Sequence, residues 1–439
     1  MGRKAAVHNL GCKVNAYEAE AMQQQLQEAG YEIVPFEPGA DLYVINTCSV
    51  TNIADRKSRQ MLHRAKKMNP DAIVVAAGCY SETGLTVLQK DPAVDLILHN
   101  NQKSRLIELL DSLEKERTKS PEPFLPINRE REYEELSIKK TQDRVRCFIK
   151  VQDGCNQFCT YCIIPYARGR VRSRRKEGVL SEVRTLAEAG YKEIVLTGIH
   201  LSSYGLDFSG EDKDGLLSLI TEVHKIPGIE RIRLGSLEPG IITPEFAREL
   251  SALPKVCPHF HLSLQSGCDR TLERMNRRYR TREYEEKCAL LREAFELPAL
   301  TTDVITGFPG ETEKDFEESL SFVEKIGFYE THVFPYSRRE GTRAASMPDQ
   351  LTEAVKKERA DRLLRLNERQ KEKYERSMIG RTLSVLLEEE LVLDGKPVCA
   401  GYSREYVRVA VEKNRASSAV NEIVTVKPQA FLMPHLLSE

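Results

Sequence analysis

Residues 154–162 read GCNQFCTYC and directly follow a run of residues that is typical of a β-strand. The three cysteines, Cys155, Cys159 and Cys162, therefore share one short loop. Such a C-x3-C-x2-C loop can place three thiolates on three irons of a cubane cluster, which leaves the fourth iron without a protein ligand. Zinc would need a fourth ligand nearby, and no Cys or His follows Cys162 before His200. The spacing favours an iron–sulfur cluster with one open iron over a zinc site or unrelated buried cysteines.

Strands and helices alternate on the carboxyl side of this loop, which predicts a parallel sheet covered by helices. The predicted strands are residues 146–151, 193–197, 231–234, 259–264, 300–306 and 331–334. Six such units fall short of the eight that close a barrel, so we expect an open, partial (β/α)6 barrel over residues 144–375. Its last part, residues 351–377, reads as one long charged helix.

The N-terminal residues 1–117 also alternate strands and helices, and we expect a separate open parallel α/β sheet there. Its predicted strands are residues 5–10, 42–46, 72–77 and 95–98, with helices at 17–28 and 52–68. Residues 118–143 are rich in proline and charge, which indicates a linker that wraps the surface.

The C-terminal residues 376–439 change to short strands, predicted at residues 383–388, 406–411 and 422–427. Asp394 and Gly395 form the dipeptide that is typical of a tight hairpin turn. We expect a small all-β barrel of the kind that binds oligonucleotides. The overall fold class is thus α/β, with an all-β domain at the C-terminus.

A second set of cysteines, Cys12, Cys48 and Cys79, is dispersed along the N-terminal domain. Each follows a different predicted strand, and the carboxyl ends of parallel strands lie side by side at one edge of a sheet. Geometry alone leaves two readings open: a shared metal site, or three small buried side chains. The other five cysteines have no ligand spacing and are predicted to be structural: Cys147, Cys257, Cys268, Cys288 and Cys399.

The charge is balanced, with 65 Lys and Arg against 66 Asp and Glu in 439 residues, so any nucleic acid must be held by a local basic patch. The densest basic run lies just after the cysteine loop and predicts RNA-backbone binding by Arg168, Arg170, Arg172, Arg174 and Arg175, although such a run is often a solvated face. A hydrophobic fraction of 41% excludes disordered and fibrous classes. Without an apolar stretch of about 20 residues or a signal peptide, we expect a cytoplasmic protein with no membrane partner.

The cysteine loop resembles the defining motif of the radical S-adenosylmethionine (SAM) superfamily. The resemblance implies that SAM binds the open iron through its amino and carboxylate groups, and that one electron converts it to a 5′-deoxyadenosyl radical. No side chain is then expected to be catalytic in its own right, because the cofactors carry the chemistry. The positions expected to contact SAM are Tyr161, Gly198, Glu238, Gln265 and Ile305, although Tyr161 could simply pack the loop and Gly198 could form a plain turn.

Three further segments resemble the methylthiotransferase branch of this superfamily: NLGCKVN at residues 9–15, NTC at 46–48 and AGC at 77–79. The resemblance covers essentially the whole chain in matching domain order. It implies that Cys12, Cys48 and Cys79 hold an auxiliary [4Fe-4S] cluster, also with one open iron, and that the C-terminus is an RNA-binding TRAM domain. It further implies two SAM molecules per reaction, one as methyl donor and one as radical source.

Members of the family act on isopentenyl-adenosine in tRNA, on threonylcarbamoyl-adenosine in tRNA, or on an aspartate of a ribosomal protein. The segments GCKVN at residues 11–15, IIPYARGR at 163–170 and TGIHL at 197–201 look like the bacterial threonylcarbamoyl type. The implied reaction is methylthiolation of carbon 2 of N6-threonylcarbamoyladenosine at tRNA position 37, with flavodoxin or ferredoxin as electron donor. A carbon-2 hydrogen is not acidic enough for a side-chain base, which accounts for radical chemistry. The alternatives are the other two substrates, or a non-catalytic RNA-binding protein with structural zinc.

Overall fold

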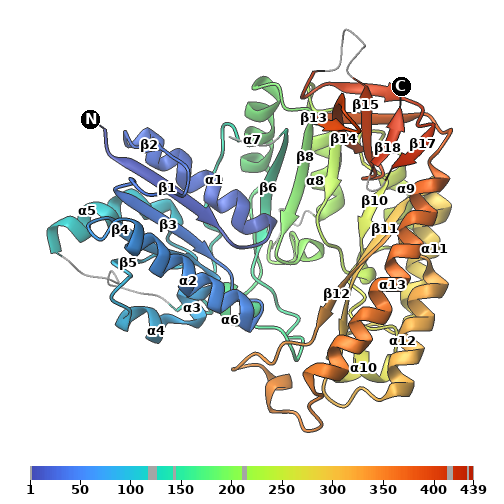
Figure 1. Ribbon diagram of the computed structural model, residues 1–439, viewed down its shortest axis with the longest axis horizontal. Coiled ribbons are helices and arrows are strands. Elements are labelled where there is room, and N and C mark those ends of the chain that lie inside the picture. Colours follow the sequence, from blue (N-terminus) through green and yellow to red (C-terminus); the bar gives the residue numbers. More distant parts are fainter. Residues whose placement is uncertain are drawn as a thin grey trace.

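The computed structural model describes residues 2–116, 126–141, 145–209, 215–412, 419–432 and 435–438. Figure 1 shows three parts in chain order: an N-terminal α/β unit, a central barrel open on one side, and a C-terminal unit of strands beside the last barrel strands. The expected fold class is confirmed for all three parts.

The N-terminal unit is a five-stranded sheet in which every pair of neighbours is parallel. The strand order is β2 (Glu32–Ile33), β1 (Lys4–Asn9), β3 (Leu42–Thr47), β4 (Ile73–Gly78) and β5 (Leu96–Ile97). All residues of β3 are buried because helices cover both faces of the sheet. The helices are α1 (Lys13–Glu28), α2 (Asn52–Met68), α3 (Cys79–Thr83), α4 (Leu85–Lys90) and α5 (Leu106–Glu116). The four predicted strands are confirmed, whereas the two-residue β2 was not predicted.

The central barrel contains the six predicted parallel strands. They are β6 (Arg146–Asp153), β8 (Glu193–Gly198), β9 (Arg231–Leu234), β10 (His259–His261), β11 (Ala299–Thr306) and β12 (Glu330–Pro335). Isolated parallel bridges, such as Leu237 with Leu262, join the β9 side to the β10 side. The short strand β7 (Arg172–Ser173) pairs antiparallel with β6. The barrel is therefore open and partial, as expected.

Helices cover the outside of the barrel, and the long charged helix predicted near the end of this part is confirmed as α13. The helices are α6 (Ile164–Arg168), α7 (Lys176–Glu188), α8 (Leu216–His224), α9 (Pro244–Ser251), α10 (Asp269–Arg274), α11 (Thr281–Ala294), α12 (Glu313–Ile326) and α13 (Glu353–Ser377). Thr352 caps α13 by accepting a hydrogen bond from the amide of Val355. No helix in the described ranges is long and apolar enough to cross a membrane.

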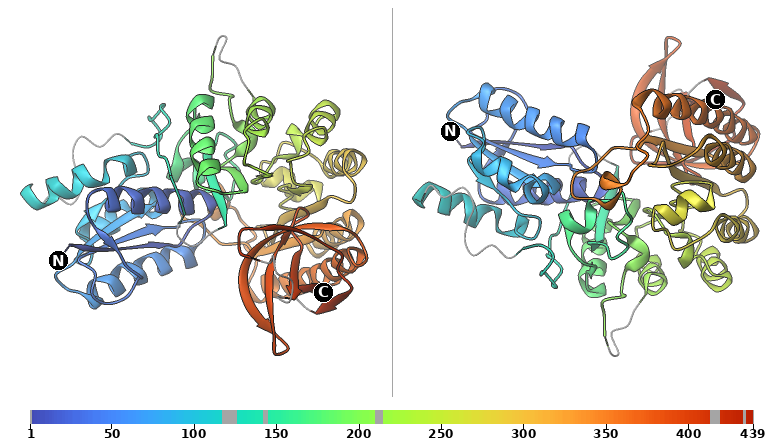
Figure 2. Two further views of the ribbon diagram at one scale, coloured as in Figure 1. Left: turned by 90° about the horizontal axis from the view of Figure 1, so that it is seen from above. Right: turned by 90° about the horizontal axis from the view of Figure 1, so that it is seen from below.

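The C-terminal unit is a curved six-stranded half-barrel. Its strands are β13 (Leu383–Leu393), β14 (Lys396–Ser403), β15 (Arg408–Glu412), β16 (Ile423–Val426), β17 (Ala430–Leu432) and β18 (His435–Ser438), in the order β16-β13-β14-β15-β18-β17. Asp394 and Gly395 form the predicted hairpin turn, with φ of 47° and 78° as a type I′ turn requires. The unit lies against the barrel (Figure 2), where Arg231 of β9 donates to the carbonyl of Ser384 over 2.7 Å.

The described part of the predicted linker, residues 126–141, ties the N-terminal unit to the barrel. Leu136 and Ile138 are buried in the barrel's core, and the Tyr17 hydroxyl of α1 donates to the carbonyl of Leu136 over 2.6 Å. The remaining linker residues, and the boundaries predicted at 117–118 and 143–144, lie outside the described residues. The boundary predicted after residue 375 falls just before α13 ends at Ser377.

Candidate active site

The first set of cysteines, which we call the loop triplet (Cys155, Cys159 and Cys162), lies directly beyond the carboxyl end of β6. Gly154 has a φ of 70°, and a Cβ there would lie 1.8 Å from the carbonyl oxygen of Arg170, so only glycine lets the chain turn into the loop. Burial is the main cause that raises the pKa of the Cys162 thiol to about 12, and the neighbouring thiols of Cys159 and Cys155 also raise it. The thiols of Cys159 and Cys155 therefore both lie near enough to Cys162 to affect its pKa.

An arginine that sequence reasoning missed, Arg277, contacts the loop triplet. Its Nη1 donates to the sulfur of Cys159 over 3.3 Å, and its Nη2 donates to Oε2 of Glu238 over 2.8 Å. A cation in this position favours a thiolate and the negative charge of a thiolate-bound cluster. No sequence spacing relates Arg277 to Cys159, because the tertiary fold alone brings them together.

The second set, which we call the sheet triplet (Cys12, Cys48 and Cys79), lies beyond the carboxyl ends of three adjacent parallel strands. The strand register pairs Asn9 with Asn46 and Thr47 with Gly78, so the three loops start at one edge of the sheet. Burial is the main cause that raises the pKa of the Cys48 thiol to about 11, and the neighbouring thiols of Cys79 and Cys12 also raise it. The dispersed cysteines therefore converge, as the strand pattern predicted.

Side-chain amides hold the three loops of the sheet triplet together. Nδ2 of Asn15 donates to the carbonyl of Thr47 over 3.0 Å, and Nδ2 of Asn46 donates to the carbonyl of Asn15 over 2.7 Å. Gly78 precedes Cys79 with a φ of 86°, and a Cβ there would lie 2.4 Å from the carbonyl oxygen of Thr47. The close approach of β3 and β4 at this edge thus depends on glycine.

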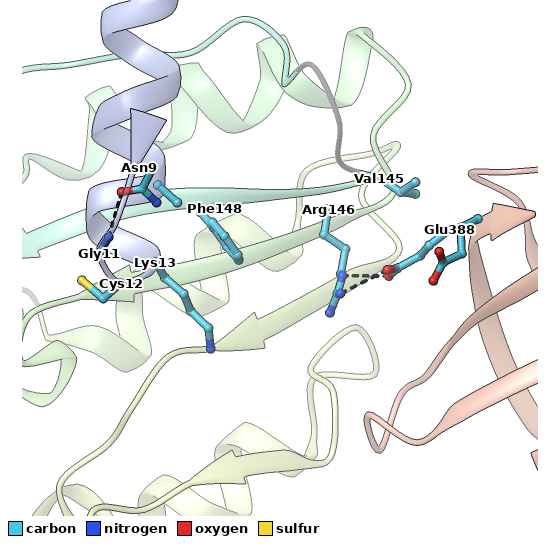
Figure 3. A pocket seen from close by; sticks show the side chains of 10 residues that line it. Asn9, Gly11, Cys12, Lys13, Val145, Arg146, Phe148 and Glu388 are labelled. Carbon is cyan, nitrogen blue, oxygen red and sulfur yellow. Dashed lines mark hydrogen bonds and ion pairs between the residues drawn. The ribbon is translucent and has the colours of Figure 1, made fainter. Parts of the chain in front are cut away.

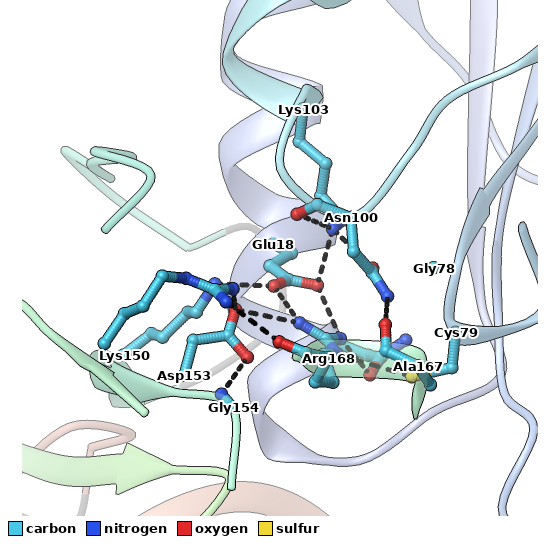
Figure 4. Close-up of polar contacts among 12 residues, drawn as sticks. Glu18, Gly78, Cys79, Asn100, Lys103, Lys150, Asp153, Gly154, Ala167 and Arg168 are labelled. Carbon is cyan, nitrogen blue, oxygen red and sulfur yellow. Dashed lines mark hydrogen bonds and ion pairs between the residues drawn. The ribbon is translucent and has the colours of Figure 1, made fainter. Parts of the chain in front are cut away.

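A buried ionic network joins the sheet triplet to the barrel (Figure 4). Nε of Arg168 donates to the sulfur of Cys79 over 3.3 Å, and its Nη2 donates to Oε2 of Glu18 on α1 over 2.9 Å. Lys150 and Asp153 of β6 complete the network, with 2.6 Å between Nζ and Oδ2. Burial opposes ionisation of Glu18, but Arg168 and the nearby lysines lower its pKa to about 2. The carboxylate is therefore ionised inside the domain interface.

A cavity of about 290 Å³ is lined by Cys162 of the loop triplet and by the residues that follow Cys48 of the sheet triplet. Tyr161, Cys162, Gln265 and Ile305 line it from the barrel side. Val50 and Thr51, which follow Cys48, line it from the N-terminal unit. Because this wall comes from both domains, the cavity exists only when the two are docked.

Comparison with known proteins places this arrangement in a family. Residues 149–323 match the model of the radical SAM superfamily, and residues 4–99 match that of the uncharacterized protein family UPF0004. The threonylcarbamoyladenosine tRNA methylthiotransferase MtaB of Bacillus subtilis is 41% identical over 96% of this chain and 93% of its own length. The MtaB of Aquifex aeolicus is 43% identical over 88% of this chain and 93% of its own.

The chain belongs to the radical SAM methylthiotransferase family. It is therefore an enzyme, a transferase that uses SAM and a [4Fe-4S] cluster. The tRNA-2-methylthio-N(6)-dimethylallyladenosine synthase of Moorella thermoacetica is also similar, at 38% identity over 86% of this chain and 85% of its own. The radical SAM methyltransferase TsrM of Kitasatospora setae shares the fold, with a TM-score of 0.57 and 16% identity over 76% of this chain and 73% of that chain.

The cavity brings together three of the five residues that were expected to contact SAM: Tyr161, Gln265 and Ile305. The other two are engaged elsewhere among the described residues. Glu238 pairs with Arg277. Gly198 lies against the side chain of Gln152, and a Cβ at residue 198 would lie only 2.8 Å from the side-chain oxygen of Gln152. The loop triplet, with a cation against Cys159 and an aromatic and an aliphatic side chain beside Cys162, fits a thiolate-bound cluster and the adenine of SAM.

The expectation that the basic run binds RNA is corrected for three of its five arginines, because their side chains are buried. Arg168 and Arg172 lie at 0% and 1% exposure in the network around Asp153, and Arg174, at 3%, pairs with Glu182. A guanidinium enclosed by carboxylates at a domain interface cannot reach a phosphate. Arg170 and Arg175 are exposed, so the expectation stands for them.

A second missed arginine, Arg339, lies in the segment after β12 and holds the loop that follows Cys48. It pairs with Asp55 of α2, and its Nη2 donates to the hydroxyl of Ser49 over 3.1 Å. The barrel's last strand is thereby fastened to the sheet triplet. The five cysteines predicted to be structural are all buried, at 2% exposure or less, which confirms their predicted burial.

Proposed function

We propose that this enzyme methylthiolates carbon 2 of N6-threonylcarbamoyladenosine at position 37 of tRNA. In this proposal the loop triplet and the sheet triplet each hold a [4Fe-4S] cluster, and two SAM molecules serve as methyl donor and radical source. The observation that carries it is the cavity that Cys162 of the loop triplet and Val50 and Thr51, just after Cys48 of the sheet triplet, line together. A radical formed at one wall and a sulfur carried at the other would then reach the same substrate atom.

The chain's own residues bind and orient in this reaction. When bound, the two clusters and SAM supply the deoxyadenosyl radical and the methylated sulfur. Arg277 and Arg168 each donate to one cluster cysteine, which stabilises the thiolate and fixes the side chain. Tyr161 and Ile305 offer an aromatic and an aliphatic surface to a purine. The docked domains keep bulk water from a radical.

The tRNA backbone would be held by exposed cations near the cavity. Arg170 and Arg175 are the exposed arginines of the predicted basic run. Helix α2, which starts close to Cys48, adds four exposed cations: Arg56, Lys57, Arg64 and Lys67. Their spacing places them along one side of the helix, where phosphate contacts give affinity without reading sequence. The electron would come from a flavodoxin or ferredoxin, and the setting would be the reducing cytoplasm.

The substrate is tested with three anticodon stem-loops that carry threonylcarbamoyladenosine, dimethylallyladenosine or unmodified adenosine. Anaerobically reconstituted enzyme, SAM and a reductant are added, and the nucleosides are analysed by mass spectrometry. We expect a methylthio group on the threonylcarbamoyl nucleoside. A product only on the dimethylallyl nucleoside would assign the enzyme to that substrate type. A parallel reaction with the ribosomal protein tests the third type, which a methylthiolated aspartate without any RNA product would support.

Metal analysis separates the enzyme from a zinc-containing RNA-binding protein. Two cubanes predict about eight irons and eight sulfides per chain. Zinc without sulfide would exclude both clusters, whereas about four irons would leave only one triplet loaded.

A further inference from the structure

A second cavity, of about 550 Å³, opens beside Cys12 of the sheet triplet, between α1, β6 and the C-terminal half-barrel (Figure 3). Cys12 lines it directly. Phe148 of β6 contributes an aromatic side chain to its wall. The volume is that of a typical small-molecule site, and an aromatic face is what a purine base stacks on.

Four charged residues line this cavity, and three of them are paired. Arg146 and Glu388 pair with each other, with 2.8 Å between Nε and Oε1. Glu389 of β13 pairs with Arg408 of β15. Lys13 has no hydrogen bond or ion pair with any described residue, and Figure 3 shows its side chain reaching from the start of α1 toward the barrel strands. The cavity thus holds one uncompensated positive charge, next in sequence to Cys12.

We infer that Lys13 binds the carboxylate of the threonylcarbamoyl group and so selects the substrate. This inference rests on the proposed function. A threonine joined through its amine to a carbamoyl group keeps a free carboxylate, whereas a dimethylallyl group is a neutral hydrocarbon. A lysine ammonium forms a strong charge-assisted hydrogen bond with the carboxylate. Beside the dimethylallyl group the same ammonium would be left desolvated and unpaired. The same residue therefore attracts one substrate and rejects the other.

The test compares two stem-loops that differ only in the threonyl group, which carries its carboxylate in one and a carboxamide in the other. Methylthio formation by the reconstituted enzyme is measured as kcat/KM. We expect the wild type to prefer the carboxylate by roughly tenfold or more, the range of a charge-assisted hydrogen bond. Lys13→Gln should bring the two rates close together, chiefly by slowing reaction of the carboxylate RNA.

Two control variants distinguish a direct contact between Lys13 and the substrate carboxylate from an indirect effect of the substitution. Lys225→Gln removes an exposed lysine at the end of α8, far along the chain from either triplet, and should keep the wild-type preference. Lys13→Arg keeps the charge and should retain a preference for the carboxylate. If Lys13→Gln lowers the iron content, the two RNAs are compared by binding anisotropy, which needs no turnover.

The outcomes are distinguishable. Equal rates on both RNAs with wild-type enzyme would overturn the role of Lys13 and leave the proposed function standing. Lys13→Gln slowing both RNAs by the same factor would also overturn it, because that result indicates charge balance at the cluster or a phosphate contact. No methylthio product on either RNA would instead refute the proposed substrate.

Discussion

One cavity lies beside Cys162 of the loop triplet and beside the residues after Cys48 of the sheet triplet, yet different parts of the structure hold the two triplets in place. The loop triplet occupies eight consecutive residues, Cys155 to Cys162, and its surroundings are loop contacts within the barrel. The sheet triplet comes from three strand ends, and a buried ionic network ties it to the barrel across a domain interface. Each triplet has one arginine that donates over 3.3 Å to a cysteine sulfur. The sheet triplet should therefore depend on domain docking much more than the loop triplet does.

The largest difference is expected when one cysteine is removed from each triplet. Cys159→Ala should abolish both deoxyadenosine formation from SAM and methylthio transfer, because the radical source is lost. Cys12→Ala should keep deoxyadenosine formation and lose transfer. Chromatography of deoxyadenosine and mass spectrometry of the RNA measure the two activities. Each variant should retain about four irons.

Retained transfer in Cys12→Ala would refute the auxiliary-cluster role of the sheet triplet. Cys147→Ala offers a matched control, because Cys147 is a buried cysteine of β6 that touches neither cavity as a lining residue. It should keep both activities.

The next largest effect is a difference in stability between variants of Arg168 and Arg277, the arginines that contact the two triplets. Arg168→Met leaves Glu18 buried without its main partner and removes one of the cations that face Asp153, which should destabilise the protein by about 3–5 kcal/mol. Arg277→Met leaves only Glu238, so we expect a smaller loss of roughly 1–3 kcal/mol. Denaturant unfolding measures both values.

A rescue variant tests the cause of the Arg168 effect. Adding Glu18→Gln to Arg168→Met removes one of the stranded charges and should restore part of the lost stability. An equal or greater loss in the double variant would show that packing of the Arg168 side chain, rather than its charge, stabilises the interface.

Sequence patterns correctly predicted the features of this protein that are encoded within a few consecutive residues. The loop triplet, the six barrel strands and the Asp394-Gly395 turn all follow from spacing or alternation over a few residues. The sheet triplet needed one further step, the rule that parallel strands end at one edge. The arginine run was misread because its burial depends on tertiary packing: Glu18, the main partner of Arg168, lies 150 residues before it in the chain. Tertiary contacts leave no mark in a charge pattern, so Arg277 and Arg339 were missed for the same reason.

A pH dependence is also expected at the interface of the sheet triplet. The pKa of Glu18 is lowered from 4.5 to about 2, so its ionised form stabilises the folded state. This contribution is fully present above pH 4.5 and is lost as the pH falls toward 2. The shift corresponds to about 3 kcal/mol.

In the metal-free protein, Glu18→Gln should therefore be less stable than wild type at pH 7, and the difference should shrink between pH 4.5 and 2. Glu28→Gln makes the same change on the exposed face of α1, where the pair with Lys139 is solvated, and should show little difference at any pH. A pH-independent loss in Glu18→Gln would mean that its size and hydrogen bonds, rather than its charge, hold the two domains together.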